Sequence, residues 1–300
     1  MNLAFVFNDS PRYWTVGSYL KRELAKQDEI DVVAHARIPE DVPIIEEQNK
    51  FDIDLVVVVD CSVHYKLHHC KGKLCKKTKT CVWLSDMHRP EWASWRLQMI
   101  KEWKYDHVFY AQKNFRDMIL KVGYKDTECT YLPHATDSEI FKPMPWIKKR
   151  YDIGFVGYNN PKRQSFVNLL KDYMIFKHFD SVWELNAARR LNELKIGFNV
   201  SLEDDALNMR SFETMSVGIP LLINRVVGNG MEDFFIEDKD FLAFSDGNEL
   251  KEKAVRLLAN PEMRKIISDS ARNKVLAMHT YRNRMNTILG TMGFEMLKNY

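Results

Sequence analysis

Residues 194–224, LKIGFNVSLEDDALNMRSFETMSVGIPLLIN, decide the fold class of this chain. An apolar run at 194–200 leads into a polar loop, a stretch with helical spacing at 206–217, a Gly-x-Pro turn and a second apolar run at 219–223. Apolar strands without alternation, joined by a helix, are typical of a parallel sheet that is covered on both faces. The stretch therefore predicts a strand–helix–strand unit of an α/β domain.

The same alternation of strands and helices extends in both directions along the chain. Further strands are expected at 2–8, 31–36, 54–60, 80–84, 107–110, 129–132, 151–156 and 241–244. Further helices are expected at 16–26, 91–102, 113–122, 163–172, 249–258, 261–278 and 279–297. This order indicates doubly wound, Rossmann-like α/β architecture throughout the chain.

A change of pattern at residues 133–150 predicts a linker between two domains. These residues contain three prolines and show no clear periodicity. We place the domains at 1–146 and 147–280, and expect the helix at 281–300 to pack back toward the first domain. Two doubly wound domains that face each other across a cleft would bind ligands in that cleft, beyond the carboxyl ends of their strands.

Composition limits the classes of protein to consider. The 300 residues suffice for two domains, and the fractions of hydrophobic (45%) and charged (28%) residues are typical of a soluble globular protein. No apolar run approaches the length of a membrane span, and the N-terminus lacks the features of a signal peptide, so we expect a cytoplasmic protein. The odd number of cysteines, five, indicates free thiols. The net charge of +3 is too small to indicate a nucleic-acid binder.

The helix expected at 206–217 can bind a phosphorylated ligand. Asp204 or Asp205 can cap its N-terminus, while Gly218 and Pro220 end it. Its N-terminus then presents unpaired N–H groups and the positive end of the helix dipole toward the cleft, which favours a phosphate.

Arg210 and Glu213 lie three residues apart and so occupy neighbouring positions on this helix. Glu213 can accept hydrogen bonds from the cis hydroxyls of a ribose, Arg210 can neutralise a diphosphate, and Asn208 lies beside them. The alternative is an ordinary ion pair on a solvated helix face.

Four stretches together resemble a known family. They are SLEDDALNMRSFETMSVGIPLLINR (201–225), LPHATDSEIFKP (132–143), YDIGFVGYNNPKRQSFVNLL (151–170) and HTYRNRMNTIL (279–289). They are similar to group-1 glycosyltransferases of the GT-B fold, and most similar to the spore-maturation-protein (CgeB-like) branch. The resemblance covers residues 130–290, whereas the first 130 residues match only in pattern.

The resemblance implies transfer of a sugar from a nucleotide-sugar, with the donor on the second domain and the acceptor on the first. Glu213 would hold the donor ribose. Asp205 stands where relatives often carry a glutamate beside the sugar, and Asn208 would share that role. Such enzymes generally need no metal, so we expect no metal site, no tightly bound cofactor and a UDP-sugar as donor.

The resemblance also implies a donor site at the turn after the strand at 151–156. Relatives carry a basic pair after Gly157. In this chain Tyr158 replaces the first basic residue, and Lys162 or Arg163 supplies the second. We expect Arg163 to bind the diphosphate, because a guanidinium matches the geometry of a phosphate. The alternative for Lys162 and Arg163 is a solvated first turn of a helix.

Candidate catalytic residues in the first half are expected at strand ends and in the linker. Asp86 and His88 follow the strand at 80–84, where a general base or a group that orients the sugar would lie. The alternative is a capped turn into the next helix. His134 in the linker is similarly placed, with packing at the hinge as its alternative. Arg12, at the exit of the first strand, is a candidate for acceptor binding.

The segment 64–79 contains six lysines, three histidines and no acidic residue. It can be a solvated loop or a surface for an anionic acceptor, in which Lys71 and Lys73 would take part. A zinc site formed with the cysteines of 61–75 is a further alternative, although the spacing matches no common pattern.

The acceptor class stays open among glycan, protein and nucleic acid. The alternatives to a glycosyltransferase acting on an unidentified acceptor are a non-catalytic nucleotide-sugar or glycan-binding component of a surface layer, and a glycosyltransferase acting on nucleic acid.

Overall fold

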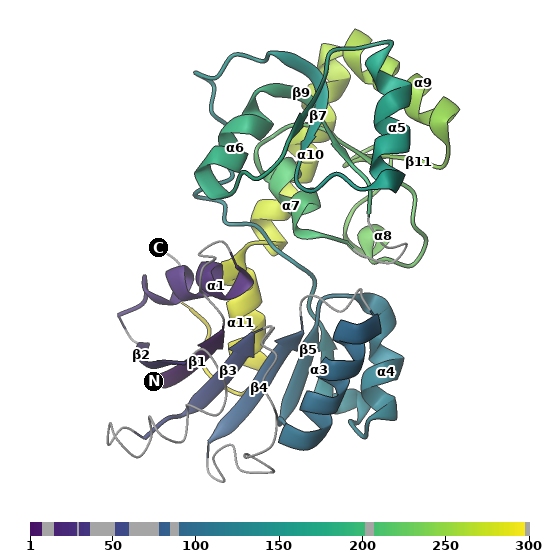
Figure 1. Cartoon of the computed structure of the whole chain (residues 1–300). Coiled ribbons are helices and arrows are strands. Elements are labelled where there is room, and N and C mark those ends of the chain that lie inside the picture. Colours follow the sequence, from purple (N-terminus) through teal and green to yellow (C-terminus); the bar gives the residue numbers. More distant parts are fainter. Residues whose placement is uncertain are drawn as a thin grey trace. The chain divides into compact units, whose positions relative to one another are not determined.

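The computed structural model describes residues 1–7, 15–28, 30–36, 52–59, 78–84, 90–201 and 207–297. The chain divides into two compact units. Unit 1 comprises Met1–Pro133 together with Tyr281–Tyr300, and unit 2 comprises His134–Thr280. Each unit is built on one parallel sheet flanked by helices (Figure 1). The α/β class with two parallel sheets, predicted from the sequence, is confirmed.

The sheet of unit 1 has the strand order β2-β1-β3-β4-β5-β6, and all its pairs are parallel. Its strands are β1 Asn2–Phe7, β2 Asp31–Ala36, β3 Leu55–Val59, β4 Lys79–Leu84, β5 His107–Tyr110 and β6 Cys129–Tyr131. Every residue of β3 is buried, because helices cover both faces of a sheet of this kind. Asp54 lies just before β3, and its carboxylate accepts a hydrogen bond from the Asn2 backbone N–H at 2.7 Å.

The described helices of unit 1 come from both ends of the chain. They are α1 Val16–Leu24, α3 Pro90–Trp103, the 3-10 turn η1 Lys113–Phe115, α4 Arg116–Lys121, the 3-10 turn η2 Asp126–Glu128 and α11 Tyr281–Thr291. The C-terminal α11 packs on α1, where the rings of Tyr19 and Tyr281 stack with centroids 4.9 Å apart. Arg284 of α11 donates a hydrogen bond from Nε to the Pro133 carbonyl at 2.6 Å.

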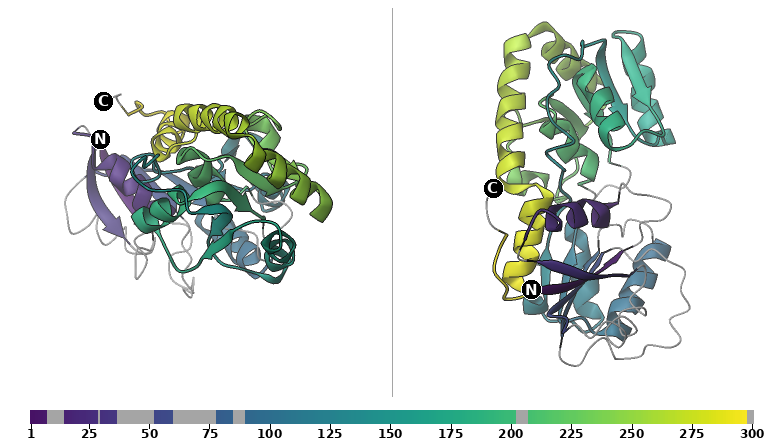
Figure 2. Two further views of the ribbon diagram at one scale, coloured as in Figure 1. Left: turned by 90° about the horizontal axis from the view of Figure 1, so that it is seen from above. Right: turned by 90° about the vertical axis from the view of Figure 1, so that its left-hand side faces the viewer.

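The sheet of unit 2 has the strand order β11-β10-β9-β7-β8 and is also fully parallel. Its strands are β7 Tyr151–Val156, β8 Phe176–Phe179, β9 Leu194–Asn199, β10 Leu221–Asn224 and β11 Leu242–Phe244. Its helices are α5 Pro161–Lys171, α6 Glu184–Asn192, α7 Met209–Ser216, α8 Met231–Phe234, α9 Gly247–Ala259 and α10 Pro261–Met278. The long α10 lies along one side of this unit (Figure 2).

Three elements of unit 2 were absent from the sequence prediction, namely β8, α6 and the four-residue α8. Strand β8 reads FKHF and lies at the edge of the sheet, so its apolar run is broken by Lys177 and His178. Helix α6 buries mainly the small side chains of Ala187 and Ala188 together with Leu191. An apolar stripe this weak gives little periodic signal.

The units divide at Pro133, whereas the sequence placed the domain boundary after residue 146. The intervening residues pack with unit 2, because Phe141 and Met144 are buried in one cluster with Val156 and Leu191. The predicted linker therefore contributes apolar side chains to a core, in spite of its prolines.

Cys81 and Cys129 are buried free thiols, and the other three cysteines lie outside the described residues. None of the helices in the described part of the chain is long and apolar enough to cross a membrane.

Candidate functional site

Strands β7 and β9 are neighbours in the sheet of unit 2, and the chain changes direction between them. The connection through α5 leads from β7 outward to the edge strand β8, and the connection through α6 returns across β7 to β9. This arrangement is a topological switch point, and open α/β sheets bind ligands beyond the carboxyl ends of the strands at such a point. The polar residues that follow β7 and β9 are therefore the first candidates for a site.

The turn after β7 places Arg163 in the first turn of α5. Gly157 has a φ of +137°, which glycine adopts without strain, and its N–H bonds to the Phe179 carbonyl at 3.0 Å. Asn160 caps α5 by accepting the Arg163 backbone N–H at 2.7 Å, and Pro161 occupies the first helical position.

The guanidinium of Arg163 turns inward and joins the ends of both strands. Only 5% of this residue is exposed, and its Nη2 donates to the Val200 carbonyl at 2.7 Å and to Asn199 Oδ1 at 3.2 Å. Its Nη1 donates to the Tyr158 carbonyl, and its Cζ lies 4.6 Å from the centroid of the Phe155 ring.

Burial lowers the pKa of Arg163 to about 10, and the nearby Arg210 charge adds to this effect. Arg163 thus remains a fixed cation at neutral pH. The neighbouring Lys162 is exposed, as is the Tyr158 ring, so the two candidates beside Arg163 lie on the solvent side of the turn.

Asn199, the last residue of β9, connects Arg163 to α7. Its Nδ2 donates to Asn208 Oδ1 at 2.9 Å and to Ser211 Oγ at 3.1 Å, while its Oδ1 accepts from Arg163. Asn199 was not among the site residues expected from the sequence. The available signal was a single amide at the end of the strand LKIGFN, a position from which a side chain reaches the carboxyl end of the sheet.

Helix α7 begins later than predicted, at Met209. Its N-cap is Asn208, whose side chain accepts the Ser211 backbone N–H at 3.3 Å, and not Asp204 or Asp205. Its C-terminal end agrees with the expectation from the sequence. Gly218 follows the last turn with a φ of +74°, the left-handed conformation that commonly ends helices.

Arg210 and Glu213 form an ion pair on α7, with Nη1 and Oε2 2.5 Å apart. The pair does not lie on a solvated face, because Glu213 is only 2% exposed. Within the described part of the chain neither of these two atoms has a partner in hydrogen-bond geometry. The pair is therefore held by charge, and both groups retain the capacity to bond a ligand.

Burial raises the pKa of the Glu213 carboxyl to about 7, well above its ordinary value. The charge of Arg210 opposes this effect, and the carboxylate of Asp137 reinforces it. Desolvation is the larger influence, because a buried carboxylate loses more interaction with water than one imperfectly aligned cation restores. Asp137 itself accepts hydrogen bonds from the backbone N–H groups of Glu139 and Ile140, at 3.0 and 3.3 Å.

Five of the donor-binding candidates lie on the segments that follow β7 and β9, namely Gly157, Arg163, Asn208, Arg210 and Glu213. His134 is half-buried at the start of unit 2. Six other candidates lie outside the described residues: Asp86, His88, Asp205, Arg12, Lys71 and Lys73. Among the residues that the structure describes, no group of three or more His, Cys, Asp or Glu side chains is arranged to hold a metal.

Comparison with known proteins shows a likeness to glycosyltransferases. Residues 145–290 match the family model described as glycosyl transferase-like. A search of curated proteins finds no match to this chain. Solved structures match at low identity and high coverage, and they show that the fold is that of the GT-B glycosyltransferases.

Three of these structures illustrate the range of the likeness. HepE from Anabaena, in complex with UDP-glucose, is 10% identical with a TM-score of 0.66, covering 97% of this chain and 99% of HepE. An α-glucosyltransferase in complex with UDP-glucose and DNA containing an abasic site is 8% identical with a TM-score of 0.65, covering 97% and 99%. TarM is 12% identical with a TM-score of 0.58 over 80% of this chain, which spans only 54% of TarM.

Proposed function

We propose that this chain is a glycosyltransferase that moves a sugar from a nucleotide-sugar, with a UDP-sugar as the expected donor. The observation that carries the proposal is the group of Arg163, Arg210 and Glu213 at the carboxyl ends of β7 and β9. This group lies inside the segment that matches the glycosyl transferase-like family model. The complexes of HepE and of the α-glucosyltransferase with UDP-glucose support the choice of donor class.

In this proposal the two arginines have different roles. The side chain of Arg210 is 18% exposed and its Nη1 lacks a hydrogen bond within the described residues, so it can contact the diphosphate directly. Arg163 is almost completely buried and donates to three acceptors. We therefore assign Arg163 to holding the two loops together and to supplying positive potential, which differs from the direct contact expected from the sequence.

Glu213 would accept hydrogen bonds from the ribose hydroxyls of the donor. The first turn of α7, capped by Asn208, would present backbone N–H groups to the phosphates. Asn199 would position both loops, since it contacts Arg163 and Asn208 at once.

The proposed reaction breaks the bond between the anomeric carbon and the diphosphate oxygen, whose electron pair leaves with the phosphate. The acceptor forms the new bond to the anomeric carbon and loses its proton to a base or to the departing phosphate. Negative charge grows on the diphosphate during this step, and a fixed cation such as Arg210 stabilises it. Asp86, His88, His134 and Asp205 remain the candidate catalytic residues. The acceptor class and the CgeB-like branch also remain proposals from the sequence.

The test uses Glu213→Ala with Glu232→Ala as a matched control, because Glu232 is an exposed carboxylate on α8 of the same unit. UDP binding is measured by calorimetry, and UDP release is measured with a panel of UDP-sugars. We expect wild type and Glu232→Ala to bind UDP and release it from one donor, and Glu213→Ala to lose at least tenfold in affinity. Full activity of Glu213→Ala would contradict the role assigned to this residue. Absence of UDP binding by wild type would contradict the proposal of a UDP-sugar donor.

A further inference from the structure

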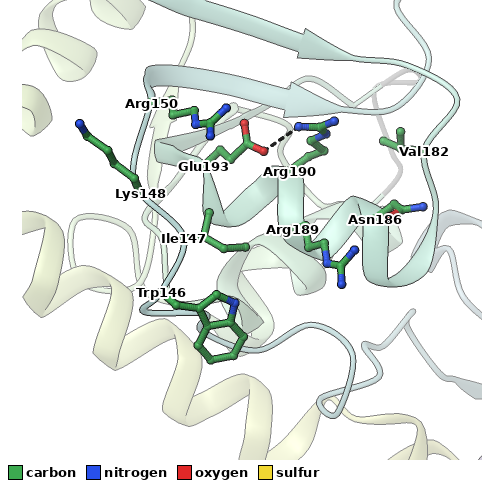
Figure 3. A pocket seen from close by; sticks show the side chains of 9 residues that line it. All are labelled: Trp146, Ile147, Lys148, Arg150, Val182, Asn186, Arg189, Arg190 and Glu193. Atoms are coloured by element: carbon green, nitrogen blue, oxygen red, sulfur yellow. Dashed lines mark hydrogen bonds and ion pairs between the residues drawn. The ribbon is translucent and has the colours of Figure 1, made fainter.

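A pocket of about 570 Å³ lies beside α6 in unit 2. Its lining, shown in Figure 3, consists of Trp146, Ile147, Lys148, Arg150, Val182, Asn186, Arg189, Arg190 and Glu193. We call it the α6 pocket. None of these residues belongs to the candidate donor site, and a volume of this size is in the usual range for small-molecule sites.

The α6 pocket extends along α6, from Val182 after β8 to the amino ends of β7 and β9. Trp146–Arg150 immediately precede β7, and Glu193 immediately precedes β9, so this part of the lining is at the amino ends of the two central strands. The donor-site residues follow the carboxyl ends of the same strands. A strand of six residues spans about 20 Å, so a ligand held at Arg150 and Glu193 would lie apart from the donor site.

The lining of the α6 pocket is strongly basic, with four cationic side chains and one carboxylate. Arg190 pairs with Glu193, at 2.7 Å from Nη1 to Oε1. The side chains of Lys148, Arg150 and Arg189 form no ion pair with any described residue. Arg150 and Arg189 are exposed. Lys148 is directed away from the other side chains of the pocket (Figure 3). Arg150 and Arg189 are thus the cations available to an anionic ligand.

An exposed indole stands at the same pocket. Trp146 is 75% exposed although it is a large aromatic side chain, and the apolar side chains of Ile147 and Val182 line the pocket with it. An exposed indole forgoes the favourable free energy of burial. A tryptophan of this kind beside cations without ion-pair partners is typical of a binding surface.

The carboxylate of Glu193 adds a hydrogen-bond acceptor to the wall of the α6 pocket. This residue is 7% exposed, and its Oε2 has no hydrogen-bond partner among the residues described. A buried acceptor of this kind favours a ligand that carries hydroxyl donors near its acidic groups. A ligand with only phosphates at this wall would meet a like charge.

We propose that the α6 pocket binds an anionic carbohydrate, with a sugar ring against Trp146 and acidic groups at Arg150 and Arg189. The combination of cations, one aromatic platform and a carboxylate acceptor matches a ligand that is both acidic and rich in hydroxyls. A single-stranded nucleic acid would instead call for a continuous basic groove with successive aromatic platforms. The carbohydrate reading is the one that the lining favours.

Binding at the α6 pocket does not depend on the transferase proposal. Its biological role does rest on the proposed function, because a pocket remote from the donor would anchor a long acceptor chain while another part of that chain reacts. We therefore infer that the acceptor is an anionic glycan.

The test measures binding by calorimetry in the absence of donor, with the full chain. The probes are an oligogalacturonate, whose acids are carboxylates, and an oligosaccharide that carries phosphate monoesters. A neutral cello-oligosaccharide and a DNA oligonucleotide of equal length complete the set. The variants are Trp146→Ala and the pair Arg150→Ala with Arg189→Ala. The control pair is Lys171→Ala with Lys239→Ala, exposed cations of the same unit outside the pocket.

We expect at least one acidic oligosaccharide to bind wild type and the control, with a tenfold or greater loss in each pocket variant and no change in UDP binding. The acidic probe that binds more tightly identifies the acid as carboxylate or phosphate. The proposal is overturned if neither acidic probe binds wild type, if the pocket variants bind like the control, or if the neutral or DNA probe binds equally well. If the pocket variants lose glycan binding and no protein binds UDP, the pocket proposal stands and only the transferase proposal is rejected.

Discussion

At the scale of single residues, the charge of Glu213 depends on the groups around it. Burial pushes its pKa up toward 7, while Arg210 lies 2.5 Å away and favours the charged form. The carboxyl therefore titrates near neutral pH, unlike an exposed glutamate. A ribose hydroxyl that donates to Glu213 would favour its ionised form, so donor binding and proton release are expected to be coupled.

The raised pKa of Glu213 predicts a pH-dependent effect on stability. The folded state holds this proton more tightly than the unfolded state, so the stabilising contribution is fully present below the unfolded pKa of 4.5 and is lost as pH rises through about 7. Glu213→Gln mimics the protonated form and does not titrate. The free energy of unfolding of Glu213→Gln minus that of wild type should therefore grow by about 3 kcal/mol between pH 4.5 and pH 8.

Urea denaturation across this pH range, followed through the transition of unit 2, measures the effect in Glu213→Gln. Glu232→Gln on the surface of α8 provides the control. A difference between Glu213→Gln and wild type that stays flat from pH 4.5 to 8 would contradict the raised pKa.

At the scale of elements, the approach of α7 to β9 decides where the donor-site residues lie. Gly197 of β9 permits this approach, because a Cβ at its position would stand 2.2 Å from Thr214 Cγ2 and 3.2 Å from Ile219 Cδ1. Thr214 is buried and β-branched, so its side chain has few alternative rotamers. The distance between helix and strand is thus set by the absence of a side chain at one position.

Gly197→Ala is expected to push α7 away from β9. Overpacking of this kind costs about 1–3 kcal/mol, and the shift should weaken UDP binding because Arg210 and Glu213 move with the helix. Gly290→Ala is the control, since no atom lies within 4 Å of a Cβ built there, and alanine in α11 should leave stability unchanged or raise it. Thermal denaturation and UDP calorimetry measure both effects, and a Gly197→Ala protein as stable as wild type would contradict this account of the packing.

At the scale of the whole molecule, the chain ends in the unit in which it begins. Unit 2 is one uninterrupted segment, whereas unit 1 requires α11 from the C-terminal end. Four side chains of α11 are at most 1% exposed: Tyr281, Met285, Ile288 and Leu289. Their burial stabilises unit 1 by on the order of 6–12 kcal/mol, which is comparable with the stability of an entire domain.

The two units are therefore expected to differ when they are produced separately. Residues 134–280 alone should fold and unfold cooperatively, whereas residues 1–133 alone should fail to do so. Joining 281–297 to residue 133 through a flexible linker should restore a cooperative transition in unit 1. Circular dichroism melts of the three fragments measure this, and a stable fold of residues 1–133 by themselves would show that α11 is dispensable.

The sequence predicted most of the elements, and several of them with their bounds. The bounds of β2, β5, β7 and α10 agree with the structure. The predicted start of α7 was wrong, because several residues within 204–208 can cap a helix. Asn208 is the cap in the structure, where it also bonds to Asn199, and a contact between two segments is invisible in a local pattern.

The sequence by itself determined the alternation of strands and helices, the parallel α/β class and the segment that holds Arg163, Arg210 and Glu213, because these depend on local spacing. Only the tertiary structure decided which of these side chains are buried, how Asn199 joins two loops, and that residues before β7 and along α6 form a basic pocket. Desolvation and close approach depend on what other segments pack around a residue. These quantities therefore arise only when β7, β9 and their helices come together.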